Sequence, residues 1–389
     1  MQLDFHYYAT YCAAFLAGFS HEEALAVSYS AQFVDECSVT LLTKIQGPKA
    51  AATTQLQSEL MDAFTDPPGL QYITRIWASF HFLPYDLNAE VGKGGRKYKQ
   101  KDRLICDVNG VLVADTVKLA KGRGLQAAGL AMHVLADTWA HRYFAGTPSL
   151  VINNTNYHFY ELIDDGDGVT EKKVRFNHNP LSEDALDTGS YVNSLYQTGE
   201  NSIMNLGHGR AGHFPDYSFA RYRYLPAWND YREITKDNPS DYYHAFCQMI
   251  FAMKYLRGEV PVFETDRYDT EAAAPWEARI RQIIGRRQLN ASADWKAFGE
   301  ELSGQEIEDF DIEKHLTEYM QAGTDEKDDT FLGRFILAAL AQKSMVTNRI
   351  FQSGSNLAGI SVDFERKGFK GIRDYMKLVS AERKRRKHE

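Results

Sequence analysis

Residues 131–144, AMHVLADTWAHRYF, constrain the fold more than any other stretch of the chain. His133, Asp137 and His141 recur at intervals of four residues, so on an α-helix they lie along one slowly winding stripe. Most residues between them are small or apolar, which predicts a buried helix. A buried carboxylate between two imidazoles needs a partner, and a divalent cation is a natural one. A carboxylate that hydrogen-bonds both histidines without a metal remains the alternative.

Size and composition indicate a folded protein with a substantial core. The chain has 389 residues, of which 44% are hydrophobic and 25% charged, so disorder is excluded. The net charge of −8 provides no overall attraction to nucleic acid. The start of the sequence shows no export signal, and the apolar run at 335–341 is too short to span a bilayer. Four cysteines without a CxxC pair are typical of free thiols in a reducing compartment. We therefore expect a cytoplasmic protein.

Hydrophobic spacing predicts a mainly α fold. Helical patterns cover the first 45 residues, and Ser20 with Glu23 forms a capping box for a helix expected at about 21–42. Further helices are expected within 115–144, broken at 121–124, and at 241–256, 274–287, 293–302, 311–321 and 330–351. Residues 145–240 are irregular in pattern, with a short strand expected at 169–177. The predicted organisation is a helical metal-binding core at 1–256 with a mixed insertion at about 145–240, a C-terminal helical region at 257–380 and a basic tail at 381–389.

Other polar residues occur in apolar surroundings upstream of the opening motif. His6 lies in an aromatic segment, Asp35 in the second predicted helix, and His81 between two phenylalanines. Each alone is typical of a buried hydrogen-bonded group. Together with the opening motif they form a set of six nitrogen and oxygen donors, which fits a site for two or three zinc ions.

The order of these residues resembles the zinc-dependent phospholipase C / P1 nuclease superfamily. The resemblance covers about residues 1–145 and extends to 240–256, and it implies a multi-helix bundle of that type, with extra C-terminal helices here. It also implies up to three zinc ions, or other divalent metals, and hydrolysis of phosphodiesters or phosphomonoesters. Asp35 would be a metal bridge or general base. The ligands implied are His6, Asp35, His81, His133, Asp137 and His141. The first 24 residues also resemble a bacterial family of uncharacterised proteins.

Two departures concern the remaining ligands of that family. Its secreted members bind zinc through the amine and carbonyl of a mature N-terminal Trp, whereas this sequence starts with Met-Gln. A later His-x-x-x-Glu/Asp pair is also not evident. His208, His213 and Asp216 in NLGHGRAGHFPDY are candidates to replace it, as is His244. Arg210 in the same stretch is expected to hold a phosphate oxygen, although an ordinary surface turn fits the stretch as well.

The predicted function is metal-dependent hydrolysis of a phosphate ester by a metal-activated water. The substrate would be a phosphorylated small molecule, a lipid head group or a nucleotide, and the basic loop at 91–103 either guides it or is merely solvated. The alternative is a non-catalytic relative, in which a structural metal or polar cluster supports a protein-interaction module. A hydrolase of the HD type is disfavoured because no adjacent His-Asp dipeptide occurs.

Overall fold

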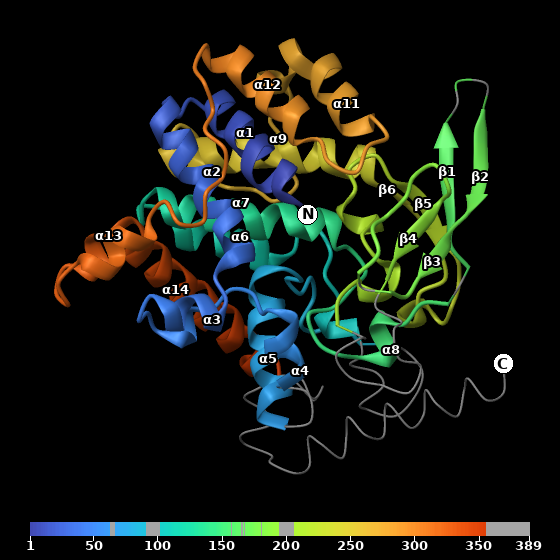
Figure 1. Cartoon of the computed structure of the whole chain (residues 1–389), viewed down its shortest axis with the longest axis horizontal. Helices are drawn as coiled ribbons and strands as arrows, with labels where there is room; N and C mark the ends of the chain where they lie inside the picture. Colours follow the sequence, from blue (N-terminus) through green and yellow to red (C-terminus); the bar gives the residue numbers. More distant parts are fainter. Residues whose placement is uncertain are drawn as a thin grey trace.

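Helices make up most of the protein, and the strands gather on one side of it (Figure 1). The computed structural model describes residues 1–62, 67–90, 102–156, 158–164, 166, 168–179, 181–193 and 206–354. The prediction of a mainly α class is confirmed. No helix in these ranges is long and apolar enough to span a membrane. Most of the predicted basic loop and the whole basic tail lie outside the described residues.

One helix, α7 (Leu125–Ala140), is enclosed by the others. Its residues from Gln126 to Ala140 are all buried. Four helices pack around it: α2 (His21–Glu36), α6 (Val111–Ala120), α9 (Asn238–Arg257) and α14 (Phe331–Gln352). A helix with neighbours on every side has no solvent face to carry polar residues, so the His and Asp residues of α7 stand out within it.

The chain enters this core through a distorted helix. The segment η1 (Asp4–Ala9) is a π-helix that continues into α1 (Thr10–Leu16). A π-helical turn is rare and is often found at functional sites. Met1, which precedes it, is buried beside α7 (Figure 1).

The capping box predicted at Ser20 and Glu23 is present. The helix it begins is shorter than expected, because α2 ends at Glu36 and α3 (Val39–Lys44) starts anew. The Ser38 hydroxyl accepts a hydrogen bond from the Leu41 amide at 3.1 Å and so caps the second helix. Asp35 consequently lies in the last turn of α2.

The contact between α2 and α7 depends on Gly129. A Cβ atom at this position would lie 2.1 Å from the Val27 carbonyl oxygen and 2.7 Å from the Ser30 Cβ. Only glycine permits so close an approach of two backbones. The approach brings the last turn of α2, with Asp35, alongside the second half of α7.

The remaining helices are short and surround this centre. The C-terminal helices predicted at 274–287, 293–302 and 330–351 are present within a few residues, whereas the one predicted at 311–321 begins only at Leu316. Their bounds are α4 Gln57–Asp62, α5 Pro67–Phe80, α8 Leu150–Asn153, α10 Thr270–Ala273, α11 Glu277–Gly285, α12 Ser292–Ser303 and α13 Leu316–Gln321, with 3₁₀ turns η2 Lys49–Ala51, η5 Gly209–Ala211, η6 Phe214–Asp216, η7 Ala227–Asn229, η8 Ala274–Trp276 and η9 Lys327–Asp329.

The insertion forms two small sheets. The larger is antiparallel with the order β2-β1-β5-β6, and the smaller pairs β3 with β4 in parallel. The single strand predicted at 169–177 is interrupted at Val174, so that β2 and β3 belong to different sheets. Strand bounds are β1 Tyr160–Asp164, β2 Val169–Lys173, β3 Arg175–Asn177, β4 Ser190–Val192, β5 Arg221–Tyr224 and β6 Ile234–Asp237.

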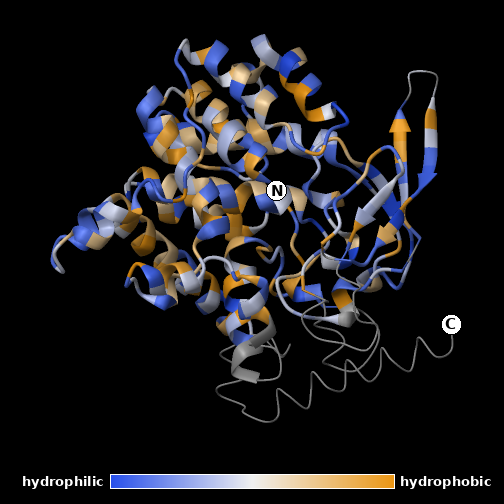
Figure 2. Ribbon diagram, in the orientation of Figure 1, coloured by the Kyte–Doolittle hydropathy of each residue, from blue (hydrophilic) through white to orange (hydrophobic). Residues whose placement is uncertain are grey.

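The main hydrophobic core is formed mostly by residues from before and after the insertion. One cluster of buried residues extends from Met1 to Ile350 and includes Trp295 and Phe335. A second, largely aromatic cluster lies under the sheets and includes Phe214. The outer helices carry both hydrophobic and hydrophilic residues (Figure 2), as expected for amphipathic helices packed on a core.

Candidate metal centre

Asp137, near the end of α7, is the meeting point of four nitrogen donors. Its Oδ1 lies 2.8 Å from the Met1 amine and 3.1 Å from His6 Nε2. Its Oδ2 lies 3.2 Å from His81 Nδ1 and 3.1 Å from His133 Nε2. All these side chains are buried. The four nitrogens come from the start of the chain, η1, the residue after α5, and α7, so tertiary packing assembles the cluster.

Asp35 faces the same cluster from α2. Its Oδ1 lies 3.8 Å from His81 Nδ1 and 3.9 Å from His133 Nε2. The Asp35 side chain is 29% exposed, whereas that of Asp137 is 1% exposed. The cluster therefore has its accessible side at Asp35. Burial raises the pKa of Asp35, although the nearby His6 and His81 oppose this effect.

A second group of ligands adjoins the first at the end of α7. His141 Nε2 lies 3.1 Å from Asp216 Oδ1, and His208 Nε2 lies 3.5 Å from Asp216 Oδ2. The Met1 amine joins the two groups, because it lies 3.1 Å from His141 Nε2 and 3.2 Å from Asp216 Oδ1 as well as beside Asp137. His208 directly precedes the 3₁₀ turn η5 of the insertion, and Asp216 is the last residue of η6.

Main-chain carbonyls fix the orientation of four of the five imidazoles. A carbonyl oxygen only accepts hydrogen bonds, so the ring nitrogen beside it must carry the hydrogen. In a neutral ring the opposite nitrogen then presents a lone pair. The pairs are His81 Nε2 with Thr53 O at 3.0 Å, His133 Nδ1 with Ala31 O at 2.9 Å, His141 Nδ1 with His81 O at 2.7 Å, and His208 Nδ1 with Gly212 O at 2.8 Å.

The orientation leaves acceptors facing one another. His81 Nδ1 and His133 Nε2 are 3.2 Å apart, and both face Asp137 Oδ2. Burial lowers the pKa of His133 to about 4, so this ring is neutral at ordinary pH. Burial also lowers the pKa of His81, but the hydrogen bond to Asp137 and the charge of Asp35 outweigh it and raise the pKa. The lone pairs of His81 Nδ1, His133 Nε2 and Asp137 Oδ2 need a positive charge between them, and either a proton on His81 Nδ1 or a metal ion would provide it.

The other charges of the cluster are also strongly perturbed. Burial alone would raise the pKa of Asp137 and of Asp216, but neighbouring histidines and the Met1 amine hold both well below the usual range. Burial lowers the pKa of His6 and of His208 to about 4. Burial opposes the charge of the Met1 amine, yet Asp137 and Asp216 raise its pKa to about 11. The centre thus combines the ionised carboxylates of Asp137 and Asp216 with the neutral imidazoles of His6, His133 and His208, and divalent metals take ligands of both kinds.

Among the described residues, three sets of ligand atoms lie close enough together to bind a metal ion, with all atoms of a set within 4.8 Å of one another. Two of the sets share His133, which has one free nitrogen, so they form one connected site. The sets are His6, His133 and Asp137; Asp35, His81 and His133; and His141, His208 and Asp216. The six ligands suggested by the resemblance are therefore brought together, with His208 and Asp216 beside them.

Two other candidates from the sequence lie elsewhere. His213 is 52% exposed and its Nδ1 lies 3.1 Å from Asp184 Oδ2, outside the cluster. His244 stacks on Trp139 with ring centroids 5.7 Å apart and belongs to none of the three sets. Arg210 follows His208 in η5, and 7% of it is exposed.

Some of the centre has no signal in the sequence. The carbonyl groups of Ala31 and Thr53 orient two of the imidazoles, but any residue type carries a carbonyl. Thr53 also ties the end of α2, because its amide donates to Cys37 O at 2.8 Å and its hydroxyl to Val34 O at 2.6 Å. These contacts place Asp35 and His81 relative to each other.

Comparison with known proteins identifies the family of the chain. No curated protein and no solved structure in the comparison matches it. A model of a family of unknown function, DUF6765, matches residues 1–350, which include every residue of the candidate centre. The chain belongs to this family of unknown function, DUF6765.

Proposed function

We propose that the protein is a metal-dependent hydrolase of phosphate esters, with zinc as the metal. The observation that carries the proposal is the convergence of imidazole nitrogens whose opposite ring atoms are hydrogen-bonded to carbonyl groups. Histidines that ligate metals are oriented in this way by their non-ligating nitrogens. Imidazole and carboxylate ligands suit zinc, although other divalent metals accept them too.

We further propose that the fold is of the phospholipase C / P1 nuclease type. The ligand order along the chain supports this, since His6, Asp35, His81 and the HxxxDxxxH motif meet in space as the resemblance implies. His208 and Asp216 stand in for the later pair that the sequence lacks. The Met1 amine lies beside His6 and the shared Asp137, and it would have to lose its proton to serve as the N-terminal Trp amine of those relatives does.

Zinc bound there would supply Lewis-acid chemistry, by lowering the pKa of a water and withdrawing charge from a phosphoryl oxygen. Asp35 would serve there as a metal ligand or as a general base, because its carboxylate is the accessible one. Asp137 holds the surrounding nitrogens in place from the buried side. The substrate class is a phosphodiester or phosphomonoester, and Arg210 remains a predicted phosphate ligand.

A structural polar cluster is the second candidate function. The raised pKa of His81 favours it, because a proton on Nδ1 would satisfy the lone pairs of His133 and Asp137 without any metal. In that case the protein would be a non-catalytic relative that binds a protein partner.

Metal analysis separates the two candidates. We expect the purified protein to contain zinc and to hydrolyse bis-p-nitrophenyl phosphate or p-nitrophenyl phosphate, with loss of activity in a chelator and recovery with zinc. Asp137→Asn should lose the metal and reduce turnover at least ~100-fold, since one carboxylate serves every nitrogen of the first group. Asp115→Asn, which removes a surface ion pair with Arg349, is the control. Metal-free wild-type protein that does not take up zinc would exclude the hydrolase.

A further inference from the structure

We infer that Gln342 and Lys343 of α14 are positioning residues for the candidate ligand His81, so that the C-terminal helix is a working part of the metal centre. The inference rests on the proposed function for its metal. It concerns residues that lie far from the ligands in the sequence and that do not themselves touch the cluster.

Lys343 holds the segment that orients the His81 ring. Its ammonium group donates to the carbonyl oxygens of Ala50 at 2.6 Å and Ala52 at 2.5 Å. The next residue is Thr53, whose carbonyl accepts the hydrogen of His81 Nε2. Lys343 is 8% exposed, and a buried ammonium is unfavourable unless its hydrogen bonds are made. Here the hydrogen bonds of Lys343 go to Ala50 and Ala52, and Thr53, which follows directly, carries the carbonyl that accepts from the His81 ring.

Gln342 holds the other side of His81. Its Nε2 donates to the Ser79 carbonyl at 3.1 Å, one of the last carbonyls of α5, and to Thr116 Oγ1 at 2.9 Å. The terminal carbonyls of a helix lack partners within the helix, so this bond fixes the point from which His81 projects. Lys343 also lies 5.7 Å from the ring centre of Phe80, the residue before His81. Two adjacent side chains of α14 thus restrain both the main chain and the ring acceptor of one ligand.

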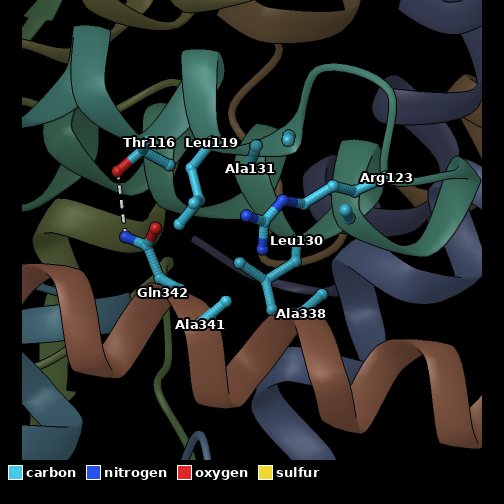
Figure 3. Close-up of a pocket in the computed structure, with 10 residues that line it drawn as sticks. Thr116, Leu119, Arg123, Leu130, Ala131, Ala338, Ala341 and Gln342 are labelled. Carbon is cyan, nitrogen blue, oxygen red and sulfur yellow. Dashed lines mark hydrogen bonds between the residues drawn. The ribbon is translucent and has the colours of Figure 1, made fainter. Parts of the chain in front are cut away.

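Gln342 has no room to serve a ligand of its own. It borders a hollow between α6, α7 and α14, where it reaches across to Thr116 (Figure 3). The hollow has a volume of about 10 Å³, which accommodates about one water molecule. Apolar side chains such as Leu130 and Ala338 line most of it. We therefore attribute the buried amide of Gln342 to its hydrogen bonds with Ser79 O and Thr116 Oγ1.

The test compares Gln342→Leu and Lys343→Met with Val346→Ala, a cavity-forming variant of the same helix whose side chain is fully buried. Zinc affinity is measured by competition with a chelator, and the visible spectrum of the cobalt(II) form reports ligand geometry. We expect each of the first two variants to bind zinc ~10-fold more weakly or worse and to change the cobalt spectrum. Val346→Ala should destabilise the fold comparably yet keep both properties of the wild type. Wild-type affinity and spectrum in Gln342→Leu and Lys343→Met, or equal losses in Val346→Ala, would overturn the inference.

A second readout does not depend on metal. In metal-free protein with ¹⁵N-labelled histidine, the His81 ring should show a hydrogen firmly on Nε2 in the wild type and an altered Nε2 resonance in Gln342→Leu and Lys343→Met. Unchanged ring resonances in both variants would refute positioning by α14. If the wild type takes up neither zinc nor cobalt, the proposed hydrolase fails, and these resonances alone decide the role of Gln342 and Lys343.

Discussion

At the scale of single residues, the centre is defined by which nitrogen of each histidine is free. His133 and His81 offer opposite ring atoms, Nε2 and Nδ1, to the same oxygen of Asp137. The hydrogen bond to Ala31 O keeps the hydrogen of His133 on Nδ1, and the hydrogen bond to Thr53 O keeps that of His81 on Nε2. The ring nitrogens are therefore set before any ion binds, which reduces the reorganisation that binding requires.

His208 and His213 give a matched pair for testing the second group of ligands. His208→Ala should lower the bound metal by about one ion and weaken activity, because its Nε2 faces Asp216 within the group. His213→Ala should retain metal and activity, because this largely exposed ring contacts Asp184 instead. Elemental analysis of the two purified variants makes the comparison. Equal metal loss in both would mean that the group is assembled differently.

Metal binding should release protons, and its affinity should fall as the pH falls. His81 has a raised pKa, so below that pKa its Nδ1 carries the proton that the ion must displace. At a pH above it the nitrogen is already free and affinity reaches its plateau. Titration calorimetry in two buffers of different ionisation enthalpy counts the protons released per ion. An affinity that is flat from pH 5 to 8 would show that His81 is not a ligand.

At the scale of elements, the separation of α2 and α7 sets the distance between Asp35 and His133. These helices touch at Gly129, about one helical turn before His133 on α7. The added methyl of Gly129→Ala would overlap the Val27 carbonyl, so one helix must move.

We expect Gly129→Ala to cost about 1–3 kcal/mol of stability or more, and to weaken metal binding by moving Asp35 away from His133. Gly285→Ala in α11 is the matched control, since a Cβ there meets nothing within 4 Å. Chemical denaturation gives the free energies of unfolding, and zinc competition gives the affinity. A stable Gly129→Ala protein with wild-type affinity would show that α2 can move without disturbing Asp35.

The sequence predicts α7 well, because its apolar pattern is local information. It also identifies His6, Asp35 and His81 as polar residues in apolar surroundings. It predicts the sheets poorly, because strands such as Arg221–Tyr224 and Ile234–Asp237 are only four residues long and carry charged residues. Asp216 is a candidate from the sequence, but its contacts with His141 and the Met1 amine arise through tertiary packing, and spacing along the chain does not report such contacts.

At the scale of the whole molecule, the C-terminal helices and the first 256 residues bury one continuous core. Trp295 of α12 packs edge-on against Phe5 of η1 at a ring-centre distance of 6.0 Å, next to His6. Phe335 of α14 packs against Phe33 of α2 at 5.0 Å. Elements from both ends of the chain therefore support the same ligand-bearing helices.

A shared core predicts one cooperative unfolding transition. Zinc at a concentration of about 100 times its Kd should raise the free energy of unfolding by about 2.7 kcal/mol, because only the folded state assembles the ligands. Calorimetry with and without zinc measures the effect, and a chelator supplies the reference state. Two separated transitions, of which zinc moves only one, would show that the C-terminal helices fold independently of the centre.

The carbonyl groups that hold the imidazoles have a consequence for how this family can vary. A hydrogen bond from main chain survives the replacement of the side chain that accompanies it, as long as the backbone keeps its path. Genetic drift at Ala31 would therefore leave the geometry of the neighbouring ring intact. Mutational scanning would therefore find the ligand positions intolerant of substitution, but it would not detect many of the residues whose main-chain carbonyls orient the ligands.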